Sequence, residues 1–433
     1  MRIGRTLPPT AAPIEVGAIV SGICGLFRGQ RELDRFELEL KEYFGFRHCF
    51  VVSSGKAAFT LILLALKELC PDRNEVLLPA FTCYSVPSSV VRAELRIRLC
   101  DQHPDSFDFD FSQLSAMLLE DLPPKVEACS EHGASEWRLE SREAAEGSQG
   151  STSRILAVVP THLFGYPADV AKLRNLIRDP DIAIIEDAAQ AMGETIEERK
   201  VGTLGDVSFF SLARGKAFSV VEGGVVLTDR NDVAEILDRL VNKLPRYGLF
   251  AQLKLIVMAT ALMLLIHPML FWIPRSIPFL KLGETVFETD FPILKMSSFQ
   301  AGLTRNWQRR LDKLREIRKD KVNRWTEILE TSRNHRLNVF GSRSLGLLRF
   351  PLKITDEKKR GTLLKESAGM GLGVMPAYPT SINLIPELRG RIQGGEFPVA
   401  ERFARQLVTL PTHGYVTQKD MTSISRLLLH ADS

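Results

Sequence analysis

One lysine and one aspartate stand where a protein could use them for covalent chemistry. Lys216 lies in "SLARGKAFSVVEGG", between two short apolar stretches and just ahead of a Gly-Gly turn. Asp187 ends the apolar run "IAIIED". A lysine amine can form a Schiff base with an aldehyde, and an aspartate can keep a ring nitrogen protonated. The two residue types therefore suit chemistry on a ring that carries an aldehyde.

A potential anion site lies nearer the start of the chain. The stretch "VVSSGKAAF" is typical of a strand, a small-residue turn and a helix, so Ser54, Gly55 and Lys56 would offer backbone N–H groups at a helix start. Ser211, at the end of the apolar run "VSFFS", could add a hydroxyl. A phosphate site joined to a lysine and an aspartate predicts pyridoxal 5'-phosphate (PLP) as the cofactor.

Each feature also has an ordinary structural interpretation. A loop lysine is usually a solvated surface residue, and an aspartate after a strand often caps a helix. The "SSGK" turn lacks the spacing of a P-loop and could be only a helix cap. The prediction of a PLP site depends on finding all of them in this order on these elements. For His162, in "THLFG", a substrate contact and a satisfied structural histidine both stay open.

Short apolar runs alternate with helical patterns through the first part of the chain. "ILAVVP" and "IAIIED" are continuous apolar runs, as expected of parallel strands covered on both faces, and "PADVAKLRNLIRD" between them is helical. We therefore predict a large doubly wound α/β domain over residues 1–248, in which ligands bind beyond the carboxyl ends of the strands. The polar stretch from Glu120 to Ser153 predicts a solvated surface insertion. Residues 290–433 predict a smaller α+β domain.

Residues 249–289 form a hydrophobic insertion between these two domains. The run from Leu255 to Ile273 holds no Lys, Arg, Asp or Glu and has about the length of a membrane-spanning helix. A single crossing would separate the two domains, and Pro268 would break the helix. We therefore expect residues 249–282 to dip into the cytoplasmic face of a membrane without crossing it. A hydrophobic contact between subunits is the alternative.

The composition excludes several classes of protein. A net charge of +4 without a long basic run gives no reason to expect nucleic acid. The six cysteines are scattered and form no C-x-x-C, so neither a metal site nor a disulfide framework is expected. The N-terminus lacks the apolar core of a signal peptide, which predicts a cytoplasmic protein, with the membrane contact at the inner face.

The order of the motifs resembles the DegT/StrS-type (DegT/DnrJ/EryC) nucleotide-sugar aminotransferases, which have the fold-type I PLP architecture. The matching segments are "SSGKAAFTLILLAL", "PAFTCYSVPSSVV", "IEDAAQAMGETIEERKVGTLGDVSFFSLARGK" and "FPVAERFARQLVTLPTHGYVTQKD". The resemblance implies transfer of an amino group from glutamate or glutamine to a nucleotide-linked keto-sugar, in cell-surface polysaccharide or glycan biosynthesis. It also implies a homodimer with active sites at the subunit interface.

The same resemblance implies a role for each candidate residue. Lys216 would carry the Schiff base, Asp187 would bind the pyridinium nitrogen, and Gln190 would lie near the ring hydroxyl. Ser211 and the turn Ser54-Gly55-Lys56 would hold the phosphate.

Three places depart from the family pattern. Lys56 stands where the family usually has threonine. Cys83 stands where an aromatic ring usually stacks on the cofactor, so Tyr84 is the expected substitute. The asparagine and arginine that the family sends across its dimer interface align with Ile293 and Lys295, so Lys295 is expected to meet the phosphate of a partner subunit.

These departures favour a second hypothesis, a non-catalytic, membrane-associated binding or scaffold protein that keeps the fold. The presence of Lys216 argues against it. It also argues against dehydration, which some relatives that have lost the lysine perform.

Overall fold

The computed structural model describes residues 3–120, 154–277, 285–331, 337–339, 344–392 and 395–430. The predicted surface insertion lies outside these residues, except for Glu120, and so do residues 278–282 of the hydrophobic insertion.

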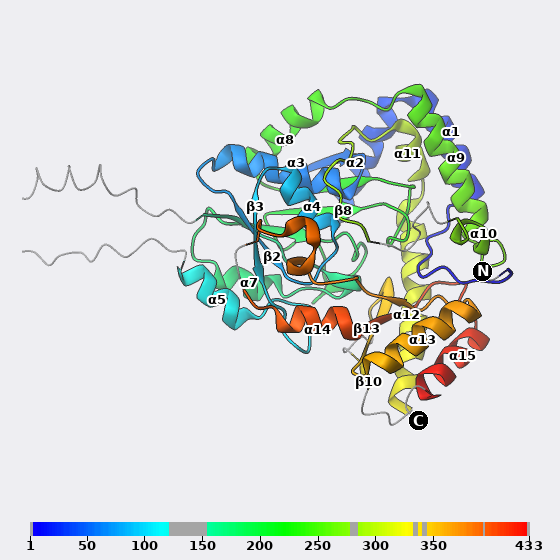
Figure 1. The fold of residues 1–433 in the computed structure, drawn as a ribbon. Coiled ribbons are helices and arrows are strands. Elements are labelled where there is room, and N and C mark those ends of the chain that lie inside the picture. The colour runs from blue at the N-terminus through cyan, green and yellow to red at the C-terminus, as the bar shows by residue number, and fades with distance from the viewer. Residues whose placement is uncertain are drawn as a thin grey trace, which may run out of the picture.

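A seven-stranded, mainly parallel sheet forms the centre of the larger part of the molecule (Figure 1). Its strand order is β1-β9-β8-β5-β4-β2-β3, and β9 runs antiparallel to both its neighbours while the other pairings are parallel. The strands are β1 (His48–Val52), β2 (Glu75–Pro79), β3 (Arg96–Cys100), β4 (Ile155–Val158), β5 (Ala183–Asp187), β8 (Val207–Ser211) and β9 (Gly224–Thr228). The predicted doubly wound fold is confirmed.

Helices cover both faces of this sheet because neighbouring strand residues point to opposite sides. Phe209 packs in a core with α3, α4 and α8, whereas Phe210 packs in a different core with α2 and α11. Further along the sheet, Leu77 and Ile184 pack against α5 and α7. These helices are α2 (Gln30–Phe44), α3 (Gly55–Leu69), α4 (Ser85–Arg92), α5 (Phe111–Glu120), α7 (Val170–Leu176), α8 (Asn231–Lys243) and α11 (Ser298–Leu303).

A smaller antiparallel sheet lies in the C-terminal part of the chain, with the order β10-β11-β13-β12. Its strands are β10 (Leu337–Val339), β11 (Arg349–Ile354), β12 (Met375–Pro376) and β13 (Leu407–Pro411). Trp325 and Leu363 pack against it from two of its helices. The helices of this part are α12 (Trp307–Thr331), α13 (Glu357–Met370), α14 (Pro398–Gln406) and α15 (Gln418–His430), and a short hairpin of β6 (Thr195–Ile196) and β7 (Arg199–Lys200) stands apart from both sheets.

The hydrophobic insertion begins with a helix. This helix ends shortly before Pro268, the residue that the sequence predicted would break it. Helix α9 covers Leu249–Leu265 and the short α10 covers Trp272–Arg275, with His267 and Pro268 between them. None of the helices in the described ranges is both long and apolar enough to cross a membrane.

Glycines bring the first helix, α1 (Val16–Arg28), close to α11. A β-carbon on Gly22 would stand 2.8 Å from the Phe299 ring, and one on Gly302 would stand 2.5 Å from the carbonyl oxygen of Ser21. A β-carbon on Gly25 would collide with the Ser298 carbonyl oxygen. Two helix backbones can approach this closely only where side chains are missing from the contact.

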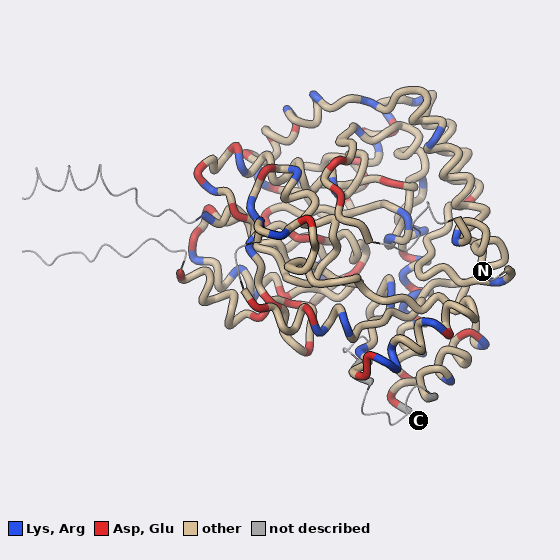
Figure 2. The backbone as a smooth tube through the Cα atoms, in the orientation of Figure 1, with Lys and Arg blue, Asp and Glu red and all other residues tan. Residues whose placement is uncertain are grey.

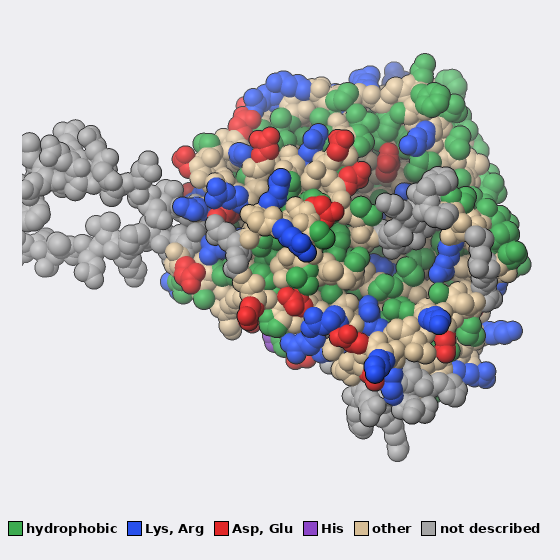
Figure 3. All heavy atoms as spheres, in the orientation of Figure 1, with side chains coloured by type: hydrophobic (Ala, Val, Ile, Leu, Met, Phe, Trp, Pro, Cys, Tyr) green, Lys and Arg blue, Asp and Glu red, His purple; other side chains and the backbone are tan. Residues whose placement is uncertain are grey.

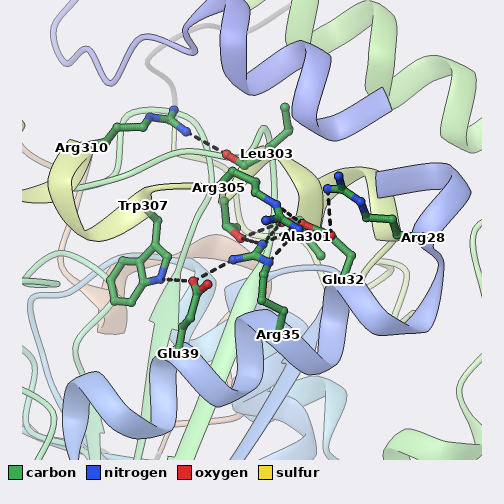
Figure 4. A network of polar contacts seen from close by, with 10 residues as sticks. Arg28, Glu32, Arg35, Glu39, Ala301, Leu303, Arg305, Trp307 and Arg310 are labelled. Atoms are coloured by element: carbon green, nitrogen blue, oxygen red, sulfur yellow. Dashed lines mark hydrogen bonds and ion pairs between the residues drawn. The ribbon is translucent and has the colours of Figure 1, made fainter. Parts of the chain in front are cut away.

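A buried carboxylate fastens α2 to the segment between α11 and α12 (Figure 4). Glu32 is 1% exposed and accepts two hydrogen bonds of 2.8 Å from the Arg305 guanidinium. Arg35 also pairs with Glu32, at 3.0 Å, and donates to the Ala301 carbonyl oxygen. Burial acts to raise the pKa of Glu32, but its arginine partners hold that pKa below the usual value.

Candidate active site

A cavity opens at the carboxyl ends of β1, β5 and β8, where the sequence predicted the site. It contains all the predicted site residues except Tyr84 and Lys295. Its lining consists of Ser54, Gly55, Lys56, Phe59, Cys83, Ser85, Val86, Ser89, Asp187, Ala189, Gln190, Phe209, Ser211, Ala213 and Lys216.

Two glycines allow the walls of this cavity to meet. Gly224 begins β9 and pairs with both Val52 and Ser211, so it lies between the ends of β1 and β8. A β-carbon on Gly224 would collide with the carbonyl group of Ser54. A β-carbon on Gly55 would stand 2.8 Å from that of Ser211. The close packing of these strand ends therefore explains both the glycine in the small-residue turn, Gly55, and the second glycine of the Gly-Gly turn, Gly224.

The turn after β1 starts helix α3, and the N-terminal end of this helix lies at the cavity. Ser54 is the N-cap, and its hydroxyl accepts a 3.1 Å hydrogen bond from the Ala57 N–H. The N–H groups of Gly55 and Lys56 belong to the first turn, where no intrahelical acceptor exists. Ser54 thus caps the helix, and the positive end of the helix dipole faces the cavity.

Asp187 and Lys216 line the same cavity from β5 and from the loop after β8. Burial raises the pKa of Asp187, against the charge of Lys216 and a 3.1 Å hydrogen bond from the Ala189 N–H. The side chain is 3% exposed. A cationic N–H partner stabilises the charged form of a carboxylate that is buried in this way.

The loop that carries Lys216 is held from several sides. Arg318, which is 3% exposed in α12, donates to the Lys216 carbonyl oxygen at 3.3 Å. Burial lowers the pKa of Arg318 to about 10. Val221 adopts a left-handed φ of 78°, which is costly for a β-branched residue. Such backbone strain persists only where the surroundings enforce it.

Gln190 and Lys56 both have partners from distant parts of the chain. The Gln190 amide donates to the Tyr378 hydroxyl at 3.1 Å. The Lys56 amine lies 3.0 Å from the Glu288 carboxylate and 4.4 Å from the centre of the Phe291 ring. The segment that follows the hydrophobic insertion therefore contacts a residue of the cavity wall.

Tyr84 and Lys295 lie elsewhere. The Tyr84 hydroxyl is 2.6 Å from the Thr380 hydroxyl, and the residue does not line the cavity, whereas Cys83 does. Lys295 pairs with Val52 through a backbone bridge on the outer side of β1, and it too is not part of the cavity wall of its own chain.

His162 is a satisfied structural residue. It is fully buried, its Nδ1 accepts from the Ala168 N–H at 2.9 Å, and its Nε2 therefore donates to Glu186 at 3.0 Å. Glu186 also accepts from the backbone N–H groups of Gly202, Leu204 and Gly205. Although burial acts to raise the pKa of Glu186, the His162 hydrogen bond and these N–H groups hold it below the usual value. The pair thus fixes the loop between β7 and β8 and leaves Asp187 to face the cavity.

A family model for the DegT/DnrJ/EryC1/StrS aminotransferases matches residues 24–121, 137–248 and 292–428. The chain belongs to this family. The model leaves residues 249–291 unmatched, the stretch that holds α9 and α10.

Individual proteins resemble this chain at low sequence identity. GDP-perosamine synthase from Caulobacter vibrioides is 28% identical over 47% of this chain and 46% of its own length. The matched region thus spans about half of that relative. The Helicobacter pylori aminotransferase PseC, involved in pseudoaminic acid biosynthesis, covers 99% of both chains with a TM-score of 0.72 and 15% identity. A Streptococcus pneumoniae protein solved in a PLP form and a PMP form gives TM-scores of 0.68 and 0.69, at 18% and 17% identity and 98–99% coverage of both chains. These solved structures establish the fold-type I architecture.

The cofactor of the family is PLP, and the residues of the cavity fit it. The open N–H groups of α3 and the Ser211 hydroxyl suit a phosphate. The buried Asp187 suits a protonated ring nitrogen, and the Lys216 amine is on the same cavity wall to meet an aldehyde.

Proposed function

We propose that this protein is a PLP-dependent aminotransferase that moves an amino group from glutamate or glutamine to a nucleotide-linked keto-sugar, for cell-surface polysaccharide or glycan synthesis. The observation that carries this proposal is the shared cavity of Lys216, Asp187 and the N-terminus of α3. Family membership supports it.

The chain's own residues have separate tasks in this reaction. When bound, PLP supplies an aldehyde and a ring that can store an electron pair. Lys216 would hold the aldehyde carbon of the cofactor, and its amine would move a proton at the donor's Cα. Asp187 would keep the ring nitrogen protonated. Gln190 would lie at the ring hydroxyl, while Ser211 and the turn Ser54-Gly55-Lys56 would hold the phosphate.

The proposal includes a homodimer in which Lys295 reaches the site of the partner subunit. In one chain Lys295 lies beside β1 and outside its own cavity, which supports a role in the other subunit. Within each subunit, residues 1–248 would form the PLP-binding domain and residues 290–433 the smaller domain.

The proposal also places residues 249–282 in contact with the cytoplasmic face of a membrane. Helix α9 carries exposed apolar side chains, and this stretch lies within the part of the chain that the family model leaves unmatched. The enzyme would therefore work in the cytoplasm at the membrane surface.

Lys216→Arg tests the proposed reaction, because arginine keeps the charge but cannot form the covalent link. Purified wild-type protein with PLP should show visible absorbance that borohydride removes, and glutamate should convert the cofactor to pyridoxamine phosphate. The variant should do neither while keeping its circular dichroism spectrum. Turnover by Lys216→Arg, or a wild-type protein that binds no PLP, would overturn the proposal, and the second result would favour the non-catalytic scaffold.

A further inference from the structure

Two helices from distant parts of the sequence share one exposed apolar face. Helices α1 and α9 lie side by side at one edge of the molecule (Figure 1), and hydrophobic side chains gather along this edge (Figure 3). We call this the α1–α9 face. It consists of the exposed side chains of Val16, Val20, Ile23, Phe27, Leu249, Phe250, Leu253, Val257 and Leu264.

The apolar stripe on α1 is not part of the protein core. Val16, Val20, Ile23 and Phe27 follow one another at intervals of four and three residues, so they lie on one side of the helix. The opposite side, with Gly22 and Gly25, packs on α11. Phe27 is 88% exposed and Val16 is 65% exposed. The helix is thus apolar on two sides, and only one of them is covered.

Helix α9 adds a second apolar strip. Leu255 and Ala259 are its buried residues, while Leu249 is 89% exposed and Phe250 is 87% exposed. Soluble monomers rarely leave contiguous apolar surface of this kind in water.

Most of the charges near this face are basic. Between Asp238 and Glu284 the sequence contains no acidic residue, whereas Lys243, Arg246 and Lys254 are exposed. Figure 2 shows the backbone of α9 mostly in tan, without acidic positions. On α1 the last residue is Arg28, which is exposed and pairs with Glu32 at 3.6 Å. The exposed Arg31 follows it, and the exposed Glu15 precedes the first turn of the helix. Such a surface complements an anionic one.

The same charges disfavour a second copy of the chain as the partner that covers the α1–α9 face. A two-fold dimer presents the same patch from both subunits, so the lysines and arginines around this face would meet one another, with Glu15 as the acidic residue beside them at the start of α1. Like charges brought together across an interface oppose its formation.

The length of α9 determines how the face would meet lipid. Seventeen residues span about 25 Å, which is shorter than the ~30 Å hydrocarbon core. Its inner side packs on protein, and His267 and Pro268 end it. Helices whose exposed side is apolar and bordered by basic residues lie flat in the headgroup region.

We propose that the α1–α9 face lies flat on an anionic lipid bilayer, with α1 supplying half of the contact and the flanking lysines and arginines selecting anionic headgroups. This inference rests on the proposed membrane contact of residues 249–282, and it adds the first helix and the charge of the lipid to it.

Vesicle flotation of the full chain tests the proposal. The probes are vesicles of phosphatidylcholine alone and vesicles of phosphatidylcholine mixed with an equal amount of phosphatidylglycerol. We expect wild-type protein to float with the mixed vesicles and to be released by salt. Two double variants should each weaken binding at least roughly tenfold, since each removes two exposed apolar side chains from the contact: Val20→Gln with Phe27→Gln on α1, and Leu253→Gln with Val257→Gln on α9.

A matched control uses exposed apolar residues that do not belong to α1 or α9. Leu38 is 52% exposed in α2 and Leu384 is 47% exposed in a short 3-10 helix, so Leu38→Gln with Leu384→Gln should float like wild type. PLP absorbance and light scattering on every variant separate lipid binding from folding, cofactor binding and assembly.

Four outcomes would overturn the inference. They are flotation with neither kind of vesicle, equal flotation with both, an unchanged α1 variant, and dissociation of a dimer by the α1 and α9 variants, which would make a second copy the occupant. An unchanged α1 variant beside an impaired α9 variant would leave the membrane contact of 249–282 standing and remove only the part assigned to α1. The aminotransferase proposal is tested independently through Lys216.

Discussion

The backbone carbonyl group of Ser54 lies so close to Gly224 that it occupies the space where a side chain of residue 224 would stand. Gly224 starts β9, and Ser54 precedes the helix that faces the cavity. The contact ties the Gly-Gly turn after Lys216 to the proposed phosphate turn. The distance between these two functional segments is therefore set by a backbone contact.

Gly224→Ala should destabilise the protein by about 1–3 kcal/mol, because the added methyl group has no room and must displace the Ser54 carbonyl. It should also weaken PLP binding. Denaturant unfolding and cofactor titration measure the two effects. Gly361→Ala in α13 is the matched control, since its β-carbon meets open space and alanine should raise stability by about 0.5–1 kcal/mol. Equal stability of the two variants would show that the contact can relax.

Asp187→Asn should retain the cofactor cavity but lose the charge that keeps the ring nitrogen protonated. By the logic of electrostatic stabilisation, we expect turnover to fall by a factor of roughly a hundred or more. Single-turnover kinetics with glutamate measure this loss, and the absorbance of the bound cofactor reports the state of the ring. A variant with wild-type turnover would exclude Asp187 as the partner of the ring nitrogen.

Mixing Lys216→Ala subunits with Lys295→Ala subunits should restore activity that neither variant has alone. If Lys295 acts in the partner's site, each mixed dimer has one intact site. Half of the dimers in a random mixture are mixed, so roughly a quarter of wild-type activity should return. The measurement is a rate after refolding the two together. No recovery would place Lys295 in the site of its own subunit or outside both, and a monomer by light scattering would exclude the arrangement.

Because the carboxyl group of Glu37 is buried, we expect the free energy of unfolding to fall as the pH rises. Burial raises the pKa of Glu37 to about 7, against a 3.2 Å hydrogen bond from the Val51 N–H. An unfolded glutamate titrates near 4.3. Between these two values the native state keeps a proton that the unfolded chain has lost, so stability falls as pH rises through this window and levels off above about 7.

Glu37→Gln keeps an acceptor for Val51 and removes this titration. Melting temperatures at pH 5 and pH 8 should fall less steeply with pH for the variant than for wild type. Glu42→Gln, at an exposed position of the same helix, should follow wild type. Identical slopes for wild type and Glu37→Gln would show that the carboxyl is ionised in the native state at pH 5.

The sequence predicted the parts of the site that depend on local pattern. Apolar runs locate the strands, and the residues that follow them, such as Asp187 and Ser211, must lie at one edge of a parallel sheet. Lys216 was found in the same way, by its place in a glycine-punctuated loop after a strand. The strand ends needed no knowledge of distant contacts.

What depends on distant contacts could not be found this way. Tyr84 was expected to stack on the cofactor, yet its hydroxyl pairs with Thr380, almost three hundred residues later. Gln190 is held by Tyr378, and the Lys216 loop by Arg318. Arg318 stands in a basic helical pattern that resembles a solvated surface, and nothing local shows that this arginine is buried.

The glycine contact between α1 and α11 also orders events during synthesis. Helix α1 leaves the ribosome first, but the segment that covers Gly22 and Gly25 begins at Ser298, some 270 residues later. At ordinary elongation rates the interval is roughly 14 to 55 s. Throughout that time the nascent first helix exposes both of its apolar sides, so its encounter with chaperones or with a lipid surface can precede the completion of the domain that it belongs to.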